Sequence, residues 1–198
     1  MKDTFLDLLS VNKGHYALES GLHGDVWFDL EIAFIHPHSL QPFIDRLADI
    51  LSGYNISAVC GALVGGAFLA YSIAQRLEID FLYTERDICI VNGVQIVSYR
   101  LPSALRSKAV NRRIGVIDDA INAGSAVTKT CDELRSSGAK PVVLASILTV
   151  GGQPLKVLSD EYPEVVSLEH LESNLWEPRQ CPLCKSGVAL IDPYKGNH

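Results

Sequence analysis

One stretch near the middle of this chain constrains its fold more than any other part of the sequence. A β-branched run at 114–117 is typical of a strand buried on both faces. The run ends in two carboxylates, Asp118 and Asp119, and small residues then lead to a predicted helix over 126–134 with Ser125 as its N-cap. This order of strand, acidic pair, small-residue loop and helix predicts one crossover of an α/β fold.

The loop after the acidic pair has the chemistry of an anion site. Small residues that open a helix leave backbone N–H groups free at the positive end of the helix dipole, where a phosphate dianion binds well. The two carboxylates would repel a phosphate but accept hydrogen bonds from sugar hydroxyls, so the stretch predicts a ribose 5-phosphate site. A strand–turn–helix crossover without a ligand is the alternative. The glycine patterns of dinucleotide-binding turns and P-loops are not present here.

A second strand, glycine loop and helix are predicted earlier in the chain, at 56–60, 61–66 and 67–77. Glycines let the backbone approach a ligand closely, so that several amides can converge on an anion. A tight crossover turn explains this loop equally well when it is taken alone. Two such loops at the carboxyl ends of two strands, however, fit a ligand with a phosphate at one end and a pyrophosphate at the other.

The rest of the chain is predicted to alternate strands and helices, which favours a mostly parallel sheet with right-handed crossovers. Arg86 and Lys108 lie in a basic segment that is predicted to be irregular apart from an edge strand at 94–97. The segment fits a lid that supplies cations to a departing pyrophosphate, and a solvated run of charges is the alternative. The remaining predictions are hairpin strands at 15–21 and 26–30, a helix at 42–51, a strand at 80–83, the irregular segment at 84–113, a strand at 140–150, a helix at 155–162 and a strand at 165–168.

Composition excludes several classes of function. A chain of 198 residues fits one domain with a sizeable core. The net charge of −6 argues against a nonspecific nucleic-acid binder, which would need a basic surface. The sequence has no run of 18 apolar residues, so we expect no membrane span.

The cysteines indicate a reducing compartment. There are five, an odd number, and the sequence starts without a secretory signal, so a cytoplasmic location is expected. Cys181 and Cys184 form a CxxC pair, which is half of a zinc site. Because such sites normally need four ligands and the other cysteines lie in other contexts, no metal site is predicted from the sequence.

Four motifs together resemble those of the type I phosphoribosyltransferases, and the resemblance covers nearly the whole chain. VIDDAINAGSA at 116–126 resembles their motif for 5-phosphoribosyl 1-diphosphate (PRPP), with Asn122 where the family usually has threonine. GALVGG at 61–66 resembles their pyrophosphate loop. GHYALESGLHGDVWFDLE at 14–31 is similar to the N-terminal hood of orotate phosphoribosyltransferases, and CPLCKSG at 181–187 is similar to the C-terminus of one branch of them.

The resemblance implies an α/β fold with a central, mostly parallel sheet flanked by helices. It implies one domain over 1–198, with a small hood formed by about 10–36 together with the tail at 165–198. It also implies a homodimer, and a Mg²⁺ ion bound mainly through PRPP. The activity implied is transfer of ribose 5-phosphate from PRPP to a pyrimidine-type base, with release of pyrophosphate.

The resemblance and the residue chemistry together assign a role to each candidate site residue. His23, Trp27 and Phe28 in the hood are predicted to bind the base. Arg86, Lys108 and Asp119 are candidate catalytic residues, and Arg86 matches a position where the family has arginine. The PRPP-binding residues are predicted to be Val64, Gly65, Gly66, Asp118, Asp119, Asn122, Ala123, Gly124, Ser125 and Ala126.

The identity of the base is left open by one position. Orotate enzymes usually end the strand at 140–150 with Asp-Arg, and the arginine helps to hold the orotate carboxylate, whereas this chain has Thr149 and Val150 there. Three hypotheses therefore stand: an orotate-type transferase, a transferase for another nucleobase, and a noncatalytic PRPP or nucleotide sensor.

Overall fold

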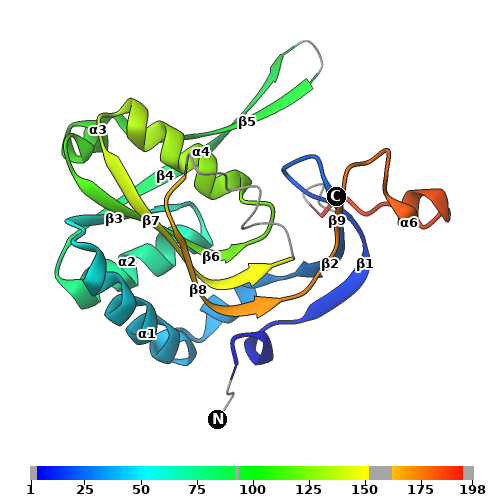
Figure 1. Cartoon of the computed structure of the whole chain (residues 1–198), viewed down its shortest axis with the longest axis horizontal. Helices are drawn as coiled ribbons and strands as arrows, with labels where there is room; N and C mark the ends of the chain where they lie inside the picture. The colour runs from blue at the N-terminus through cyan, green and yellow to red at the C-terminus, as the bar shows by residue number, and fades with distance from the viewer. Residues whose placement is uncertain (1–3, 92–93, 152–161, 194–198) are drawn as a thin grey trace.

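A computed structural model of the chain describes residues 4–91, 94–151 and 162–193. Its largest feature is a six-stranded sheet with the order β5-β4-β3-β6-β7-β8, parallel throughout except for the antiparallel edge strand β5 (Figure 1). This arrangement confirms the predicted fold class. The strands are β3 (Ala58–Ala62), β4 (Asp80–Val91), β5 (Val94–Arg100), β6 (Arg113–Ile121), β7 (Lys140–Val150) and β8 (Val165–Leu171).

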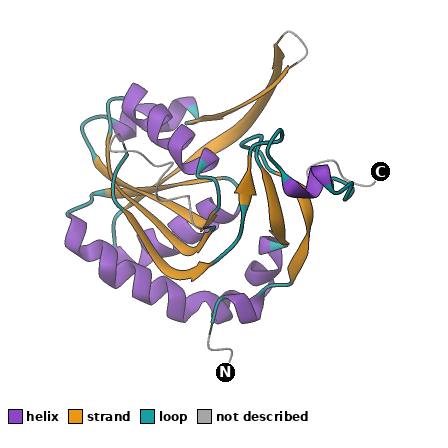
Figure 2. Cartoon of the chain, turned by 45° about the vertical axis from the view of Figure 1, so that its right-hand side comes forward, coloured by secondary structure: helices purple, strands orange, loops and turns teal. Residues whose placement is uncertain are grey.

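Helices cover both faces of this sheet (Figure 2). On one face, α1 (Gln41–Leu51) and α2 (Gly65–Leu77) bury apolar side chains at helical spacing against β3, β6 and β7. On the other face, α3 (Ser103–Ala109) and α4 (Ser125–Ser136) enclose a second apolar cluster. Because both faces are covered, the central strands are almost continuously buried, as their β-branched sequences predict.

A smaller antiparallel sheet with the order β1-β2-β9 forms the hood beside the main sheet (Figure 1). It consists of β1 (Val11–Ala17), β2 (His23–Phe28) and β9 (Leu175–Trp176). The predicted turn at 22–25 was wrong. The chain reverses at 18–22 instead, because Gly21 adopts a φ of +83° and its N–H donates to the Leu18 carbonyl at 2.9 Å.

The C-terminal tail is divided between the two sheets. Residues 165–171 form β8 at the edge of the main sheet, whereas β9 joins the hood and is followed by a short helix, α6 (Pro182–Lys185). Further along, the backbone of Ile191 bonds with His15 and Ala17 of β1, at 2.7 and 2.8 Å. The two ends of the chain therefore hold each other in place.

The basic segment at 84–113 is more regular than predicted. The strand that begins at Asp80 continues through an alternating, β-branched stretch to Val91 and pairs with β5, and the two form a hairpin that projects from the body (Figure 1). The edge strand predicted at 94–97 is confirmed as part of β5. The prediction that the rest of the segment is irregular was wrong, because β4 extends to Val91 and α3 follows β5. The predicted strand at 140–150 is confirmed as β7, whereas the helix predicted at 155–162 falls outside the described residues except for Tyr162.

The remaining elements are short. No helix among the described residues combines the length and the apolar character that crossing a bilayer would require. The 3-10 helices are η1 (Leu6–Leu8), η2 (Leu30–Ile35), η3 (Pro37–Leu40) and η4 (Ser52–Tyr54).

Candidate functional site

The strand order changes direction between β3 and β6. From β3 the chain moves outward to β4 on one side, whereas β6 adds to the opposite side of β3. Ligands of open α/β sheets bind at such a point, outside the carboxyl ends of the strands. A cavity of about 500 Å³ lies here. It is lined by most of the predicted site residues: Trp27, Phe28, Val64, Gly65, Gly66, Arg86, Asp118, Asp119, Asn122, Ala123, Gly124, Ser125 and Ala126.

The loop after β3 packs directly against the acidic pair of β6. A Cβ added at Gly65 would overlap the Oδ2 of Asp119, and one added at Gly66 would lie 2.7 Å from the Oδ1 of Asp118. The peptide bond between Leu63 and Val64, in the same loop, is cis. Glycine is therefore required at 65 and 66 because the loop after β3 lies against the acidic pair of β6.

The acidic pair faces the cavity from inside β6, which continues past it to Ile121. Burial, followed by the charge of Asp119, raises the pKa of Asp118 well above its usual value. Burial likewise raises the pKa of Asp119 to about 6, although its Oδ1 accepts a hydrogen bond from the Ala120 N–H at 2.8 Å. No basic side chain among the described residues forms an ion pair with either carboxylate. The pair therefore presents carboxylate oxygens without a cation partner to a ligand.

The helix after the acidic pair begins one residue earlier than predicted. Gly124, with a φ of +78°, is the N-cap of α4, and Ser125 is its first residue, so the predicted cap at Ser125 was wrong. A glycine fits there because the left-handed region disfavours a side chain. The first-turn N–H groups of α4 and those of α2, which starts at Gly65, have no partner within their own helices and lie at the cavity.

One further side chain in this loop lacks a partner. The Oδ1 of Asn122 is buried and accepts no hydrogen bond from any described residue. Asn122 lines the cavity where the related motif usually has threonine. A buried acceptor of this kind costs free energy unless a ligand or water donates to it.

Glu19, in the hood turn, joins the hood to the start of α4 and to strands β4 and β5. Its Oε2 pairs with the Nε of Arg86 at 2.8 Å, and its Oε1 accepts a hydrogen bond from the Ser125 hydroxyl at 3.3 Å. The Tyr99 hydroxyl donates to the same carboxylate at 3.2 Å, and burial together with the Glu19 charge raises the pKa of Tyr99. Sequence reasoning gave Glu19 no role. The only signal was its departure from the hood pattern, which usually has a basic or small residue there.

Comparisons with known proteins agree with this geometry. No protein-family model matches the chain. The chain is 27% identical over 194 residues to the orotate phosphoribosyltransferase of Caldanaerobacter subterraneus subsp. tengcongensis, an alignment that covers 96% of this chain and 94% of that protein. Over almost its whole length the chain is therefore similar to proteins named orotate phosphoribosyltransferases.

Solved structures show that it also has the phosphoribosyltransferase fold. The orotate phosphoribosyltransferase of Aeropyrum pernix superposes with a TM-score of 0.62 at 23% identity, covering 81% of this chain and 87% of that one. The adenine phosphoribosyltransferase of Thermoanaerobacter pseudethanolicus also gives 0.62, at 15% identity, covering 73% of this chain and 88% of that one. The fold is therefore common to enzymes named for different bases.

The end of the cavity next to the hood is lined by aromatic side chains. Trp27 and Phe28 reach it from β2, and Phe34 and Phe68, whose ring centroids are 5.8 Å apart, complete it from η2 and α2. Val150, at the carboxyl end of β7, is fully buried and also lines the cavity. This end of β7 therefore presents a hydrocarbon side chain where the orotate enzymes usually present an arginine.

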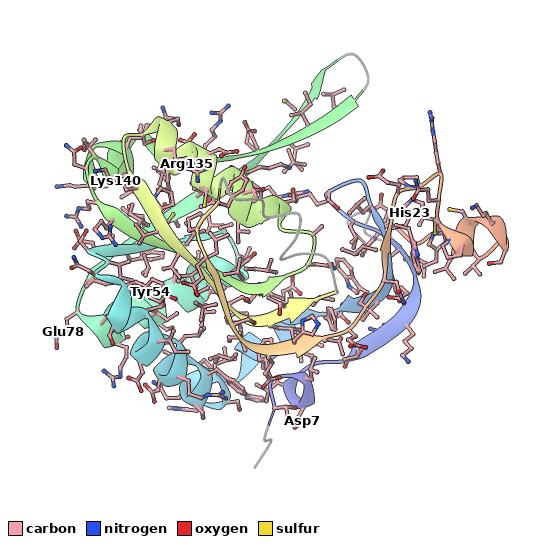
Figure 3. All side chains as sticks on the ribbon, in the orientation of Figure 1. Asp7, His23, Tyr54, Glu78, Arg135 and Lys140 are labelled. Carbon is pink, nitrogen blue, oxygen red and sulfur yellow. The ribbon has the colours of Figure 1, made fainter. Side chains whose placement is uncertain are left out.

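Two predicted site residues, Lys108 and His23, do not line the cavity. Lys108 is exposed on α3, so its placement does not support contact with a ligand in its own chain. His23 is buried in β2, and its Nδ1 lies 3.0 Å from the Nε2 of His15 and 3.3 Å from the Sγ of Cys184 (Figure 3). The prediction that His23 binds the base is therefore not supported, because its ring faces the cysteine pair instead.

The structure brings two histidines to the CxxC pair, which the sequence alone offers no reason to connect with it. Two histidines complete a four-residue group with Cys181 and Cys184 that could hold a metal ion. No sequence motif connects these four residues, because the histidines and the cysteines are more than 150 residues apart.

Proposed function

We propose that this protein transfers the 5-phosphoribosyl group of PRPP to a pyrimidine-type base, most simply orotate, and releases pyrophosphate. One observation carries the proposal: two cavity-facing carboxylates without a cation partner among the described residues lie between two loops that open helices. A pentose with phosphates at both ends satisfies all three features at once. Full-length relatives named orotate phosphoribosyltransferases support the same activity.

In the proposed complex each part of PRPP meets a different element. Asp118 and Asp119 accept hydrogen bonds from the ribose hydroxyls. The loop at 122–126 holds the 5′-phosphate at the N-terminus of α4, and the loop at 64–66 holds the pyrophosphate at the N-terminus of α2.

A Mg²⁺ ion is part of the proposal. Mg²⁺ prefers oxygen ligands and retains several waters, so it binds with few protein ligands alongside substrate phosphates. The oxygens of Asp118 and Asp119 fit this chemistry, because they face the cavity beside the loop proposed for the pyrophosphate. The ion would neutralise negative charge that develops on the leaving group.

The reaction needs little covalent chemistry from the protein. A nitrogen of the base supplies the electron pair for the new bond to C1 of the ribose, while the C1–oxygen bond breaks and its electrons leave with pyrophosphate. Positive charge develops on the sugar and negative charge on the leaving group, so positioning and electrostatic stabilisation dominate catalysis. Arg86 is the proposed cation for the leaving group. Lys108 could serve only from a neighbouring subunit, as the family resemblance implies.

A different base is the second candidate. Val150 favours it, because a buried valine at the cavity cannot pair with the orotate carboxylate. The experiment is to measure pyrophosphate release from PRPP and Mg²⁺ with orotate, uracil, adenine and hypoxanthine. Release with orotate supports the proposal, and release only with another base supports the second candidate. PRPP binding without turnover on any base would instead indicate a sensor.

We also propose that the protein is a cytoplasmic homodimer. Val64, Phe68 and Tyr71 share one face of α2 and are 56%, 52% and 57% exposed. Sedimentation should give twice the chain mass, and Phe68→Glu should give the monomer. A monomeric wild-type protein would contradict the dimer.

A further inference from the structure

Four potential metal ligands from the two ends of the chain meet beside the hood sheet. They are His15 of β1, His23 of β2, and Cys181 and Cys184 at the start of and within α6. Their ligand atoms all lie within 4.8 Å of one another. None of the four lines the phosphoribosyl cavity, so this group belongs to a different place in the fold.

The two histidines lie side by side in the hood hairpin. His23 pairs with Ala17, and the register of β1 shifts between Lys13 and Tyr16, the stretch that contains His15. Regular alternation along the strand therefore does not place His15, but the contact distances do. The Nε2 of His15 lies 3.0 Å from the Nδ1 of His23, 3.3 Å from the Sγ of Cys181 and 3.6 Å from the Sγ of Cys184.

The opposite side of the His15 ring is held by the backbone. Its Nδ1 lies 2.9 Å from the carbonyl oxygen of Val188, which can only accept a hydrogen bond. The proton of the neutral ring is therefore on Nδ1, and the lone pair of Nε2 points at the other three side chains. Metal-binding histidines commonly have this second hydrogen bond, which fixes the tautomer and the ring orientation.

Hydrogen bonds alone do not satisfy this group. The single lone pair of His15 Nε2 has three polar neighbours within 3.6 Å, and the Sγ of Cys184 is also 3.3 Å from the Nδ1 of His23. One lone pair cannot accept three hydrogen bonds at good geometry. A cation at the centre would accept a lone pair from each of the four atoms.

We propose that His15, His23, Cys181 and Cys184 bind one structural Zn²⁺ ion that fastens the C-terminal tail to the hood hairpin. Two imidazoles and two thiolates are a standard ligand set for tetrahedral zinc. With Zn–N and Zn–S bonds of about 2.0–2.3 Å, tetrahedral ligand atoms lie roughly 3.3–3.8 Å apart. Four of the separations between ligand atoms are 3.0–3.6 Å and none exceeds 4.8 Å, so side-chain adjustments bring the atoms to that spacing.

Four protein ligands leave no open position, which indicates a structural role rather than a catalytic one. The ion would clamp the base of the turn at 18–22, since His15 and His23 lie close to its two ends. That turn carries Glu19 into the phosphoribosyl cavity. Cys181 is fully buried and Cys184 is exposed, so an ion can enter from the side of α6.

The first experiment uses the unaltered protein. Elemental analysis of protein purified under reducing conditions and incubated with Zn²⁺ should give about one zinc per chain. Removal of the zinc with a chelator should lower the melting temperature by roughly 5–10 °C. Co²⁺ added to the metal-free protein should give the visible absorption of a tetrahedral site and a thiolate charge-transfer band in the near ultraviolet.

Matched variants locate the site. Cys181→Ser with Cys184→Ser, and separately His23→Asn, should lose the zinc and the cobalt spectrum. The controls Cys89→Ser and His36→Asn change exposed residues of the same types and should keep both.

Three results would overturn the proposal, and each can be obtained without a variant. They are wild-type protein that takes up no zinc, an unchanged melting temperature after chelation, and a Cys181–Cys184 disulfide, 2 Da lighter, in protein kept reduced. All readouts are metal content, spectra or stability. A failure of the proposed transferase activity would therefore leave this test intact, and the reverse also holds.

Discussion

The cavity at the carboxyl ends of β3 and β6 and the His–Cys group of the hood are built from different parts of the chain. The cavity relies on backbone amides, glycines and two carboxylates that lie in two short, continuous stretches, 61–66 and 118–126. The His–Cys group relies only on side-chain atoms, and these come from positions up to 169 residues apart. The first site therefore depends on local conformation, whereas the second forms only when the tail docks on the hood.

This difference implies that the two sites can be damaged separately. Variants of the cavity should change PRPP binding and leave the metal content intact. Variants of the His–Cys group should change the docking of the tail first. The following predictions test this separation, from the largest expected effect to the smallest.

Asp119→Asn should lower kcat/KM for PRPP by roughly 10- to 10²-fold, because a hydrogen bond to a charged acceptor contributes about 1.5–3 kcal/mol. The fold and the zinc content should not change. Pyrophosphate release, thermal unfolding and elemental analysis measure the three quantities. Asp87→Asn, an exposed acid on β4, is the control. Full turnover in Asp119→Asn would refute the ribose assignment.

Gly65→Ala should weaken PRPP binding about tenfold, the equivalent of about 1.4 kcal/mol. The new methyl group would overlap the Oδ2 of Asp119, so either the carboxylate or the loop must move. Calorimetry with PRPP and Mg²⁺ measures the change. Gly53→Ala adds the same methyl group where no atom lies within 4 Å, and should bind normally. Equal affinities in the two variants would show that the loops need not touch.

The pH dependence of the free energy of unfolding should report on Asp119 in the cavity. Because burial raises the pKa of Asp119 from 3.8 to about 6, the folded protein binds this proton more tightly than the unfolded chain does. Its contribution to stability is therefore complete below pH 3.8 and is lost as the pH rises to about 6. Denaturant unfolding of the ligand-free protein should show a loss of about 1–3 kcal/mol across this window.

Asp119→Asn is the matching variant for that titration. It should flatten the slope between pH 4 and 6 and be more stable than the wild type at pH 7. PRPP binding to the wild type should strengthen over the same window, since the ionised carboxylate is the better acceptor. An unchanged slope in the variant would mean that another group titrates.

Glu19→Gln should have the smallest effect, a roughly two- to tenfold gain in PRPP affinity, because partly exposed ion pairs and single charges contribute little. The change removes a negative charge from the Ser125 hydroxyl and releases Arg86 for the ligand. Calorimetry measures the gain, and Glu172→Gln, at an exposed position, is the control. Weaker binding would show instead that Glu19 positions Arg86 productively.

Prediction from the sequence succeeded where structure is local. The strand at 140–150 has the predicted bounds, and helices at 41–51, 65–77 and 125–136 match their predictions closely, because apolar periodicity reports burial directly. Prediction failed at the hood turn and over most of the segment at 84–113, because pairing with a partner strand determined where these strands begin and end.

The sequence by itself determined the two small-residue loops that open α2 and α4, since such a loop presents its amides wherever the helix packs. Only the tertiary structure decided that Glu19 faces Ser125 and Arg86, and that His15 and His23 face Cys181 and Cys184. Side-chain groups drawn from distant strands and tails leave no periodic signal in the sequence. Their partners are fixed by strand register and by docking, which are properties of the whole fold.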